Sequence, residues 1–202
     1  MSHYFTNDKV KSNEKTINIK IKDISLKLTV DNGVFSKKGL DFGTRTLLES
    51  IETENLKGDI LDFGCGYGPV GIYIAKQTNL KIDMADINER ALALSKKNAK
   101  LNNVDVNVFQ TNIYSNIDKK YDYIITNPPI RVGKKILYEI LFESLKHLKE
   151  DGKLFLVINK NQGAKTLLKD LNEKYSANVI KKNKGFYIIE AQNRWQQREK
   201  HL

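Results

Sequence analysis

The sequence is poor in cysteine and in long apolar runs. It contains one cysteine among 202 residues, Cys65, and a single thiol permits neither an internal disulfide bond nor a cysteine-based zinc site. No apolar run approaches the roughly 20 residues that span a bilayer. The first residues also lack the basic start and the apolar core of a signal peptide. We therefore predict a cytoplasmic protein that holds no metal and does not associate with membranes.

Arginine is scarce as well, although the chain is strongly basic. The formal net charge is +10 and the pI is about 9.4, and most of the positive charge comes from lysine. Such an excess suggests a polyanionic partner, RNA or DNA. A lysine-rich chain with abundant asparagine and isoleucine is equally typical of a solvated surface without such a partner. Charge alone leaves both interpretations open.

The length and composition fit one domain with a substantial core, since 40% of the residues are hydrophobic and 29% are charged. Near the N-terminus, residues 17–22 and 26–30 alternate between apolar and polar side chains, which predicts a β-hairpin. We predict a single domain at 1–192, made of this β extension at 1–34 and a core at 35–192. The remaining polar tail, 193–202, is expected to fray.

Strands and helices alternate through the core. Predicted strands occupy 59–62, 81–86, 104–112, 121–126 and 153–158, and the helices between and after them occupy 70–76, 88–101, 136–148 and 164–175. Asp151 and Gly152 are expected to form the turn that follows Leu148. The last strands, 178–182 and 186–191, are joined by a hairpin-like turn that introduces one antiparallel strand near the C-terminus. We predict an α/β, Rossmann-like, seven-stranded, mostly parallel sheet with helices on both faces.

Residues 59–71, DILDFGCGYGPVG, form the stretch around which the chain is organised. They predict a short strand, a glycine-rich turn and a helix start in which Pro69 is tolerated. Such a turn is expected to leave unpaired N–H groups facing a nucleotide-like ligand, with the helix dipole behind them. Gly66 to Gly71 also satisfies the G-x-G-x-x-G dinucleotide pattern, which alone is weak evidence.

An acidic residue, Asp86, ends the second strand. An acid about 20 residues after the glycine turn is expected for NAD and for any adenosine ligand with a free ribose diol. A carboxylate at this position accepts hydrogen bonds from both ribose hydroxyls. A helix-capping role for Asp86 is the alternative. Asp83 has the opposite parity in the strand and is expected to face elsewhere.

The sequence Asn127-Pro128-Pro129-Ile130 directly follows an apolar strand, so it is expected at the same sheet edge as the glycine turn. Proline restricts the residue before it and removes N–H donors. The Asn127 side-chain oxygen and the Pro128 carbonyl then form an acceptor-rich patch, which suits a substrate with an exocyclic amine. An ordinary Asn-Pro turn is the alternative.

Together, residues 62–68, Asp86 and the Asn-Pro-Pro-Ile sequence resemble class I S-adenosylmethionine-dependent methyltransferases. More narrowly, residues 35–44 and 127–134 resemble the RsmC-type small-subunit ribosomal RNA guanine-N2 methyltransferases in their short, single-domain form. This resemblance extends from the N-terminus to about Ala191. It implies S-adenosylmethionine as the cofactor, and ribosomal RNA or the small ribosomal subunit as the partner; it leaves the oligomeric state open.

The resemblance also implies individual roles at the cofactor. The glycine turn would surround its methionine part and ribose, Asp86 would hold the ribose hydroxyls, and Asn112 would accept a hydrogen bond from the adenine amine where relatives carry an acid. The cofactor-binding residues are Asp62, Gly64, Cys65, Gly66, Gly68, Asp86, Ile87, Asn112 and Asn127. Cys65 is expected to serve only as a small residue.

Other roles concern the substrate. The catalytic motif, in which Asn127 and Pro128 grip the target amine, comprises Asn127, Pro128, Pro129 and Ile130. The residues expected to contact RNA phosphates are Arg131, Lys134 and Lys135, on a surface extended by Lys37, Lys38, Lys181, Lys182 and Lys184. No general base is required, and the histidines, His147 included, are expected to be solvated.

Three other functions remain to be weighed. Ile130 departs from the aromatic residue of adenine-N6 and glutamine methyltransferases, which argues against an adenine, protein-glutamine or small-molecule acceptor. The intact glycine turn argues against a non-catalytic RNA-binding or assembly protein. An NAD-dependent dehydrogenase is disfavoured, because the chain leaves no room for a substrate domain and shows no acid–base pair.

Overall fold

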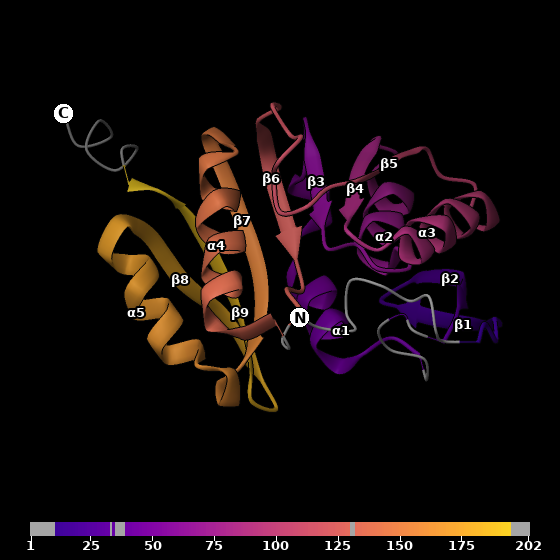
Figure 1. Ribbon diagram of the computed structural model, residues 1–202, viewed down its shortest axis with the longest axis horizontal. Coiled ribbons are helices and arrows are strands. Elements are labelled where there is room, and N and C mark those ends of the chain that lie inside the picture. The colour runs from indigo at the N-terminus through magenta and orange to yellow at the C-terminus, as the bar shows by residue number, and fades with distance from the viewer. Residues whose placement is uncertain (1–10, 33, 35–38, 130–131, 195–202) are drawn as a thin grey trace.

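The computed structural model describes residues 11–32, 34, 39–129 and 132–194 (Figure 1). Its main sheet has seven strands in the order β5-β4-β3-β6-β7-β9-β8. They are β3 (Ile60–Phe63), β4 (Ile82–Asp86), β5 (Val106–Gln110), β6 (Tyr121–Thr126), β7 (Leu148–Asn159), β8 (Tyr175–Asn183) and β9 (Phe186–Asn193). Strand β9 pairs antiparallel with both β7 and β8, whereas the pairs from β5 to β7 are parallel. The predicted sheet, with its one antiparallel strand, is confirmed.

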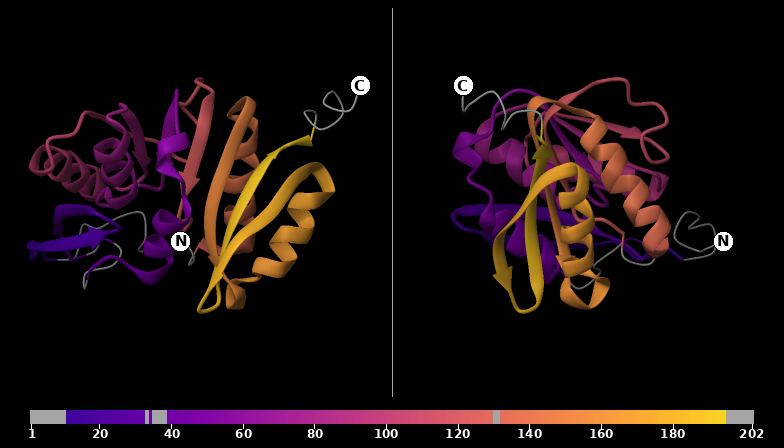
Figure 2. Two further views of the ribbon diagram at one scale, coloured as in Figure 1. Left: turned by 180° about the vertical axis from the view of Figure 1, so that it is seen from behind. Right: turned by 90° about the vertical axis from the view of Figure 1, so that its left-hand side faces the viewer.

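Helices cover both faces of this sheet, because strand residues alternate between two apolar clusters (Figures 1 and 2). Ile60 and Met84 face one cluster, and their neighbours Leu61 and Ala85 face the other. The first cluster lies under α1 (Phe42–Ser50), α2 (Pro69–Thr78) and α3 (Glu89–Leu101). The second lies under α4 (Gly133–Lys146) and α5 (Ala164–Lys174). Two short 3-10 turns are η1 (Thr53–Asn55) and η3 (Lys160–Gln162). In the part of the chain that is described, no helix is long and apolar enough to cross a membrane.

The predicted N-terminal hairpin forms a separate two-stranded sheet of β1 (Lys15–Ile21) and β2 (Ile24–Val30). Two asparagines one turn apart, Asn98 on α3 and Asn102 at its C-cap, hold the hairpin by its backbone. The Asn98 amide bonds both the N–H and the C=O of Thr29, and it also donates to the Tyr67 carbonyl at 2.8 Å. The Asn102 amide likewise bonds both the N–H and the C=O of Lys27. The hairpin is therefore tied directly to the glycine-rich turn.

Two predicted boundaries at the end of the core are wrong. Leu148 begins β7 instead of ending α4, because the helix ends at Lys146 and Leu148 pairs with Tyr121. Gly152 lies inside β7 at an irregularity in the register and not in a turn; a Cβ there would lie 2.7 Å from the Tyr121 carbonyl oxygen. Asn193 still belongs to β9, and Arg194 Nε donates to the Tyr175 carbonyl at 2.9 Å. The rest of the predicted tail lies outside the described residues.

The strand order creates a switch point between β3 and β6. Strands β4 and β5 extend from β3 in one direction, and β7 extends from β6 in the other. The carboxyl ends of these parallel strands point to the lower side of Figure 1. Ligands of open α/β sheets bind in the crevice at such a point. The glycine-rich turn after β3 and the Asn127 loop after β6 flank this crevice.

Candidate functional site

The glycine-rich turn between β3 and α2 has one packed side and one open side. Gly64, Gly66 and Gly68 have φ values of +71°, +57° and +96°, a region that favours glycine. A Cβ on Gly68 would lie 2.8 Å from Ile72 Cδ1, so that glycine is required by packing. A Cβ on Gly64 or Gly66 would meet no atom within 4 Å. These two glycines leave room for a ligand.

The backbone donors of this turn are largely used within the protein, contrary to expectation. Gly64 and Cys65 donate to the Ala85 carbonyl at 2.8 and 3.0 Å, and Gly66 donates to Asp86 Oδ2 at 2.9 Å. At the start of α2, Pro69 has no N–H and Gly71 donates to Asp62 Oδ2 at 2.8 Å. A pyrophosphate needs such donors at a helix N-terminus. The turn is therefore unsuited to a dinucleotide.

Two carboxyl groups lie beside the turn, that of Asp62 buried and that of Asp86 half-buried. Asp62 is 2% exposed; burial raises its pKa to about 7, in spite of the hydrogen bond from Gly71. Burial also raises the pKa of Asp86, whose oxygens accept from Gly66 and Asn88 N–H. None of the ion pairs among the described residues includes either carboxyl. Such a site favours a ligand that carries positive charge.

Asp86 does not cap α3, so the alternative reading of this residue is wrong. The cap is Asn88, whose side chain accepts from Ala91 N–H at 3.2 Å. Asp83 points away from the crevice, as predicted. Its carboxylate accepts hydrogen bonds from the side chains of Asn107, Lys119 and Tyr121.

The loop after β5 lies next to Asp86 and carries the exposed Asn112. Thr111 N–H donates to the Asp86 carbonyl at 3.0 Å, and Asn112 accepts from Ser115 N–H through its own carbonyl. Ile113 has a φ of +54°, which is unusual for a β-branched residue. The Thr111 hydroxyl donates to the Ile113 carbonyl at 3.0 Å and helps to hold this conformation. Strained backbone of this kind is concentrated at functional sites.

Asn127, at the end of β6, has a side-chain orientation that follows from its partners. The Thr44 hydroxyl donates its one proton to the Asp41 carboxylate. Thr44 Oγ1 must therefore act as the acceptor in its 2.8 Å contact with Asn127, so the atom facing it is Nδ2. Oδ1 is thereby directed away from Thr44. The hydrogen-bonded series Asp41–Thr44–Asn127 therefore leaves Oδ1 as an acceptor that has no partner among the described residues.

Sequence reasoning did not identify Asp41 and Thr44 as positioning residues. Asp41 caps α1, because its side chain accepts a hydrogen bond from Thr44 N–H at 3.1 Å. The same carboxylate orients the Thr44 hydroxyl. Thr44 in turn orients Asn127, which lies 83 residues further along the chain. No local pattern reports a contact over that distance.

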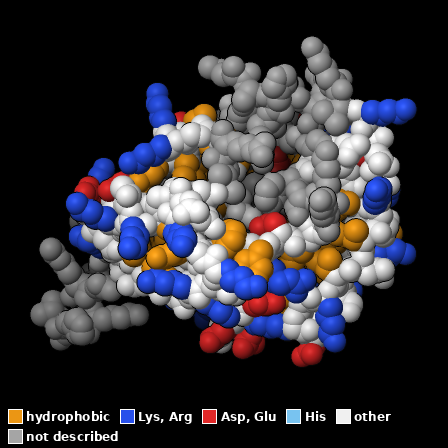
Figure 3. Space-filling model, turned by 90° about the horizontal axis from the view of Figure 1, so that it is seen from below, with side chains coloured by type: hydrophobic (Ala, Val, Ile, Leu, Met, Phe, Trp, Pro, Cys, Tyr) orange, Lys and Arg blue, Asp and Glu red, His pale blue; other side chains and the backbone are white. Residues whose placement is uncertain are grey.

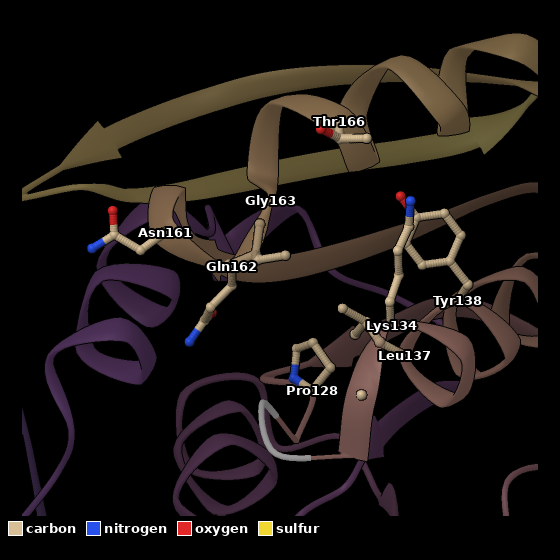
Figure 4. Close-up of a pocket in the computed structure, with 10 residues that line it drawn as sticks. Pro128, Lys134, Leu137, Tyr138, Asn161, Gln162, Gly163 and Thr166 are labelled. Atoms are coloured by element: carbon tan, nitrogen blue, oxygen red, sulfur yellow. The ribbon is translucent and has the colours of Figure 1, made fainter.

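Next to Asn127, Pro128 lines a cavity of about 390 Å³ between the start of α4 and the end of β7 (Figure 4). Lys134 lies on its rim, with its ammonium 4.8 Å from the centre of the Tyr138 ring and 3.9 Å from Asp170. Lys135 is exposed on the same first turn of α4. Ile130, Arg131, Lys37 and Lys38 lie outside the described residues.

Two residues of doubtful role have structural functions. The Cys65 thiol is buried within 3.7 Å of the Ser95 hydroxyl, and burial raises its pKa, so it is no thiolate nucleophile. Contrary to the prediction, His147 makes specific contacts within the protein and is not simply solvated. Its ring stacks on Tyr114, and its nitrogens lie 2.9 Å from the Glu143 and Ile117 carbonyl oxygens. The position of His147 in a predicted helix, next to apolar residues, gave no indication that its ring would bridge two carbonyl groups.

The comparison with known proteins identifies the family. The family model described as the methyltransferase small domain matches residues 25–190. The chain belongs to this family. Its members are S-adenosylmethionine-dependent methyltransferases, and the resemblance drawn from the sequence is confirmed.

Two curated relatives match this chain over different shares of their own length. The chain is 43% identical to the uncharacterized protein YbxB of Bacillus subtilis (strain 168) over 95% of this chain and 98% of that protein. It is 37% identical to a ribosomal RNA small subunit methyltransferase C of Psychromonas ingrahamii over 72% of this chain. That match spans only 43% of the longer relative. The chain therefore corresponds to less than half of the curated enzyme.

Among solved structures, a T. thermophilus 16S rRNA N2 methyltransferase (RsmC) in complex with AdoMet and guanosine superposes with a TM-score of 0.80. The match covers 90% of this chain and 51% of that one at 21% sequence identity. This similarity shows the fold of the methyltransferase domain.

The residues at the crevice fit S-adenosylmethionine. Its sulfonium and ammonium groups are positive, and neither the buried Asp62 nor the half-buried Asp86 forms an ion pair within the described part of the chain. The open side of Gly64 and Gly66 leaves room for the cofactor. The Asp86 oxygens already accept from backbone N–H groups and still have lone pairs for the ribose hydroxyls. The methyltransferase would hold its cofactor with these residues, with Ile87 and Asn112 beyond Asp86.

Gly66→Ala is expected to weaken S-adenosylmethionine binding by about tenfold or more, because its Cβ enters the open side of the turn. Gly163→Ala is the matched control: Gly163 has a φ of +87°, also with no atom within 4 Å of a Cβ. Both substitutions carry a similar backbone cost, roughly 1–2 kcal/mol. Calorimetric titration and thermal unfolding separate the two effects. Equal cofactor affinity in the two variants would place the cofactor elsewhere.

Proposed function

We propose that this methyltransferase methylates the exocyclic N2 amine of a guanine in small-subunit ribosomal RNA, in the cytoplasm. The observation that carries the proposal is the fixed orientation of Asn127, which points an acceptor oxygen away from Thr44 beside the crevice. An amine is the substrate group that such an acceptor suits. The likeness to methyltransferase C enzymes supports ribosomal RNA as the substrate.

The chemistry requires positioning and little proton transfer. S-adenosylmethionine supplies an already activated methyl group on its sulfonium. Asn127 Oδ1 accepts a hydrogen bond from the amine, and Pro128, which has no N–H, adds a carbonyl acceptor without a competing donor. Two acceptors favour a more tetrahedral nitrogen and stabilise the positive charge that develops on it. The Asp41–Thr44 pair keeps the acceptor oriented during this step.

Basic residues near the crevice support an RNA substrate. The side of the molecule at the carboxyl ends of the strands carries lysine and arginine side chains around much of its rim (Figure 3). Lys134 and Lys135 lie in the first turn of α4, which starts at Gly133, and Lys182 and Lys184 lie by the β8–β9 turn. These residues would contact phosphates, which strengthens binding in a salt-sensitive way without choosing the nucleotide.

The test is the transfer of labelled methyl from S-adenosylmethionine to ribosomal RNA and to small subunits from a strain that lacks this gene. Nucleoside analysis of the product identifies the methylated atom. We expect label as N2-methylguanosine in RNA of the mutant strain and none in RNA that the enzyme has already modified.

Each other outcome has a definite meaning. Label on adenine N6, on a protein glutamine or on a small molecule would keep the enzyme class and overturn the substrate. Binding of S-adenosylmethionine without transfer to any of these would favour a non-catalytic RNA-binding or assembly role.

A further inference from the structure

The cavity beside Pro128 has apolar walls and a polar end. Its apolar lining comes from Pro128, Leu137 and Ile158, and η3 with the start of α5 supplies the polar end (Figure 4). Its volume of about 390 Å³ lies in the range of small-molecule sites, roughly 300–1,000 Å³. Pro128 follows Asn127 directly in the chain, so the Pro128 end of this cavity lies next to the Asn127 loop.

Gln162 extends from η3 toward the Pro128 side of this cavity (Figure 4). Its amide orientation is fixed by chemistry: Asn159 N–H, which can only donate, lies 3.0 Å from Gln162 Oε1. The Asn159 side chain in turn accepts from Asn161 N–H, which closes a capping box around η3. Gln162 Nε2 therefore occupies the other end of the amide, with no hydrogen-bond partner among the described residues. It is a positioned donor.

We propose that the target guanine lies in this cavity and that Gln162 Nε2 donates a hydrogen bond to its O6. This assignment rests on the proposed guanine-N2 activity and adds the means by which the base is chosen. Guanine carries its N2 amine and its O6 acceptor at opposite ends of one edge. Asn127 accepts from the amine at one end, and Gln162 donates at the other.

The same pair of contacts rejects adenine. In the same orientation adenine has no amine at position 2 for Asn127, and it presents its own amine where guanine has O6. Two donors then face each other, and a site built to hydrogen-bond one group rejects an analogue that leaves its polar groups unpaired. Lys134, at the cavity rim, is placed to contact a phosphate of the same nucleotide.

The experiment measures the binding of guanosine and of 2-aminopurine riboside in the presence of S-adenosylhomocysteine. The analogue keeps the N2 amine and lacks both O6 and the N1 proton, so the comparison between native and variant proteins isolates the contact to O6. Gln162→Glu is the key variant, because its carboxylate still accepts from Asn159 N–H while it replaces the donor with an acceptor. Gln162→Met removes both functions. Asn161→Ala, on the same cavity wall, is the control.

The native enzyme should bind guanosine about tenfold more tightly than 2-aminopurine riboside, as expected for one hydrogen bond. Both Gln162 variants should lose this preference through weaker guanosine binding, and Asn161→Ala should keep it. A preserved preference in Gln162→Glu, or no binding of guanosine by the native enzyme, would overturn the role of Gln162. If N2-methylguanosine still forms in ribosomal RNA in that case, the proposed function stands and only the assignment of Gln162 fails.

Discussion

Asn127→Ala should lower the turnover of methyl transfer by about a hundredfold or more and leave the affinity for S-adenosylmethionine within about twofold. The substitution removes the acceptor oxygen that holds the amine and stabilises the charge developing on its nitrogen. The Asn127 amide bonds Thr44 and lies close to Asp41, and neither of these residues contacts the glycine-rich turn through a described hydrogen bond. Single-turnover kinetics with small subunits, and calorimetric titration with the cofactor, measure the two quantities.

A second pair of variants tests how Asn127 is positioned. Thr44→Val keeps the side-chain shape but removes the hydroxyl that fixes the Asn127 amide, and it should lower turnover by about tenfold. Thr46→Val is its control: Thr46 is buried on the same helix, and its hydroxyl donates to the Phe42 carbonyl at 2.8 Å. A full-rate Asn127→Ala enzyme would contradict the proposed mechanism. Equal loss in the two threonine variants would mean that α1 merely lost stability.

The sequence predicts most of the sheet because its strands are buried and bounded by clear turns. Strand β6 has the predicted limits, and β4 differs from its prediction by one residue. Leu148 was misplaced because its apolar side chain continues the helical spacing of α4, and spacing cannot show that its backbone pairs with Tyr121. Competition between helix and strand at such a residue is decided by tertiary pairing.

Site residues that follow parallel strands could also be predicted, since such ends meet at one edge of the sheet. This reasoning brought Asp62, Asp86 and Asn127 to the crevice. It failed for the N–H groups of the glycine-rich turn, because their acceptors, the Ala85 carbonyl and the Asp86 carboxylate, come from the neighbouring strand. The orientation of an amide such as that of Gln162 depends equally on a partner's position in space. The sequence pattern predicts which residues lie at the carboxyl edge of the sheet. Their hydrogen-bond partners determine whether each of them presents a donor or an acceptor there.

The cofactor-free enzyme should become less stable as the pH rises from 5 to 8, and Asp62→Asn should reduce this dependence. Burial raises the pKa of Asp62 from 3.8 to about 7, so between these values the folded protein binds a proton that the unfolded chain has lost. Stability is therefore greatest below the unfolded pKa and is lost as the pH rises through about 7. For one group this amounts to roughly 2–3 kcal/mol between pH 5 and 8. Chemical denaturation at several pH values measures it.

Two other carboxyls, Asp59 and Asp86, bear on the comparison of the native and variant proteins. Hydrogen bonds from Lys119 and Lys149 lower the pKa of Asp59, so its contribution changes at more acidic pH. Asp86, whose pKa burial raises, acts in the same direction as Asp62 and remains in the Asp62→Asn variant. Parallel profiles for the native and variant proteins would show that Asp62 is ionised in the folded state. If the profiles differ as expected, S-adenosylmethionine should bind more tightly as the pH rises through 7, because its positive charge favours the ionised carboxylate. The Asp62→Asn variant should show little of that change.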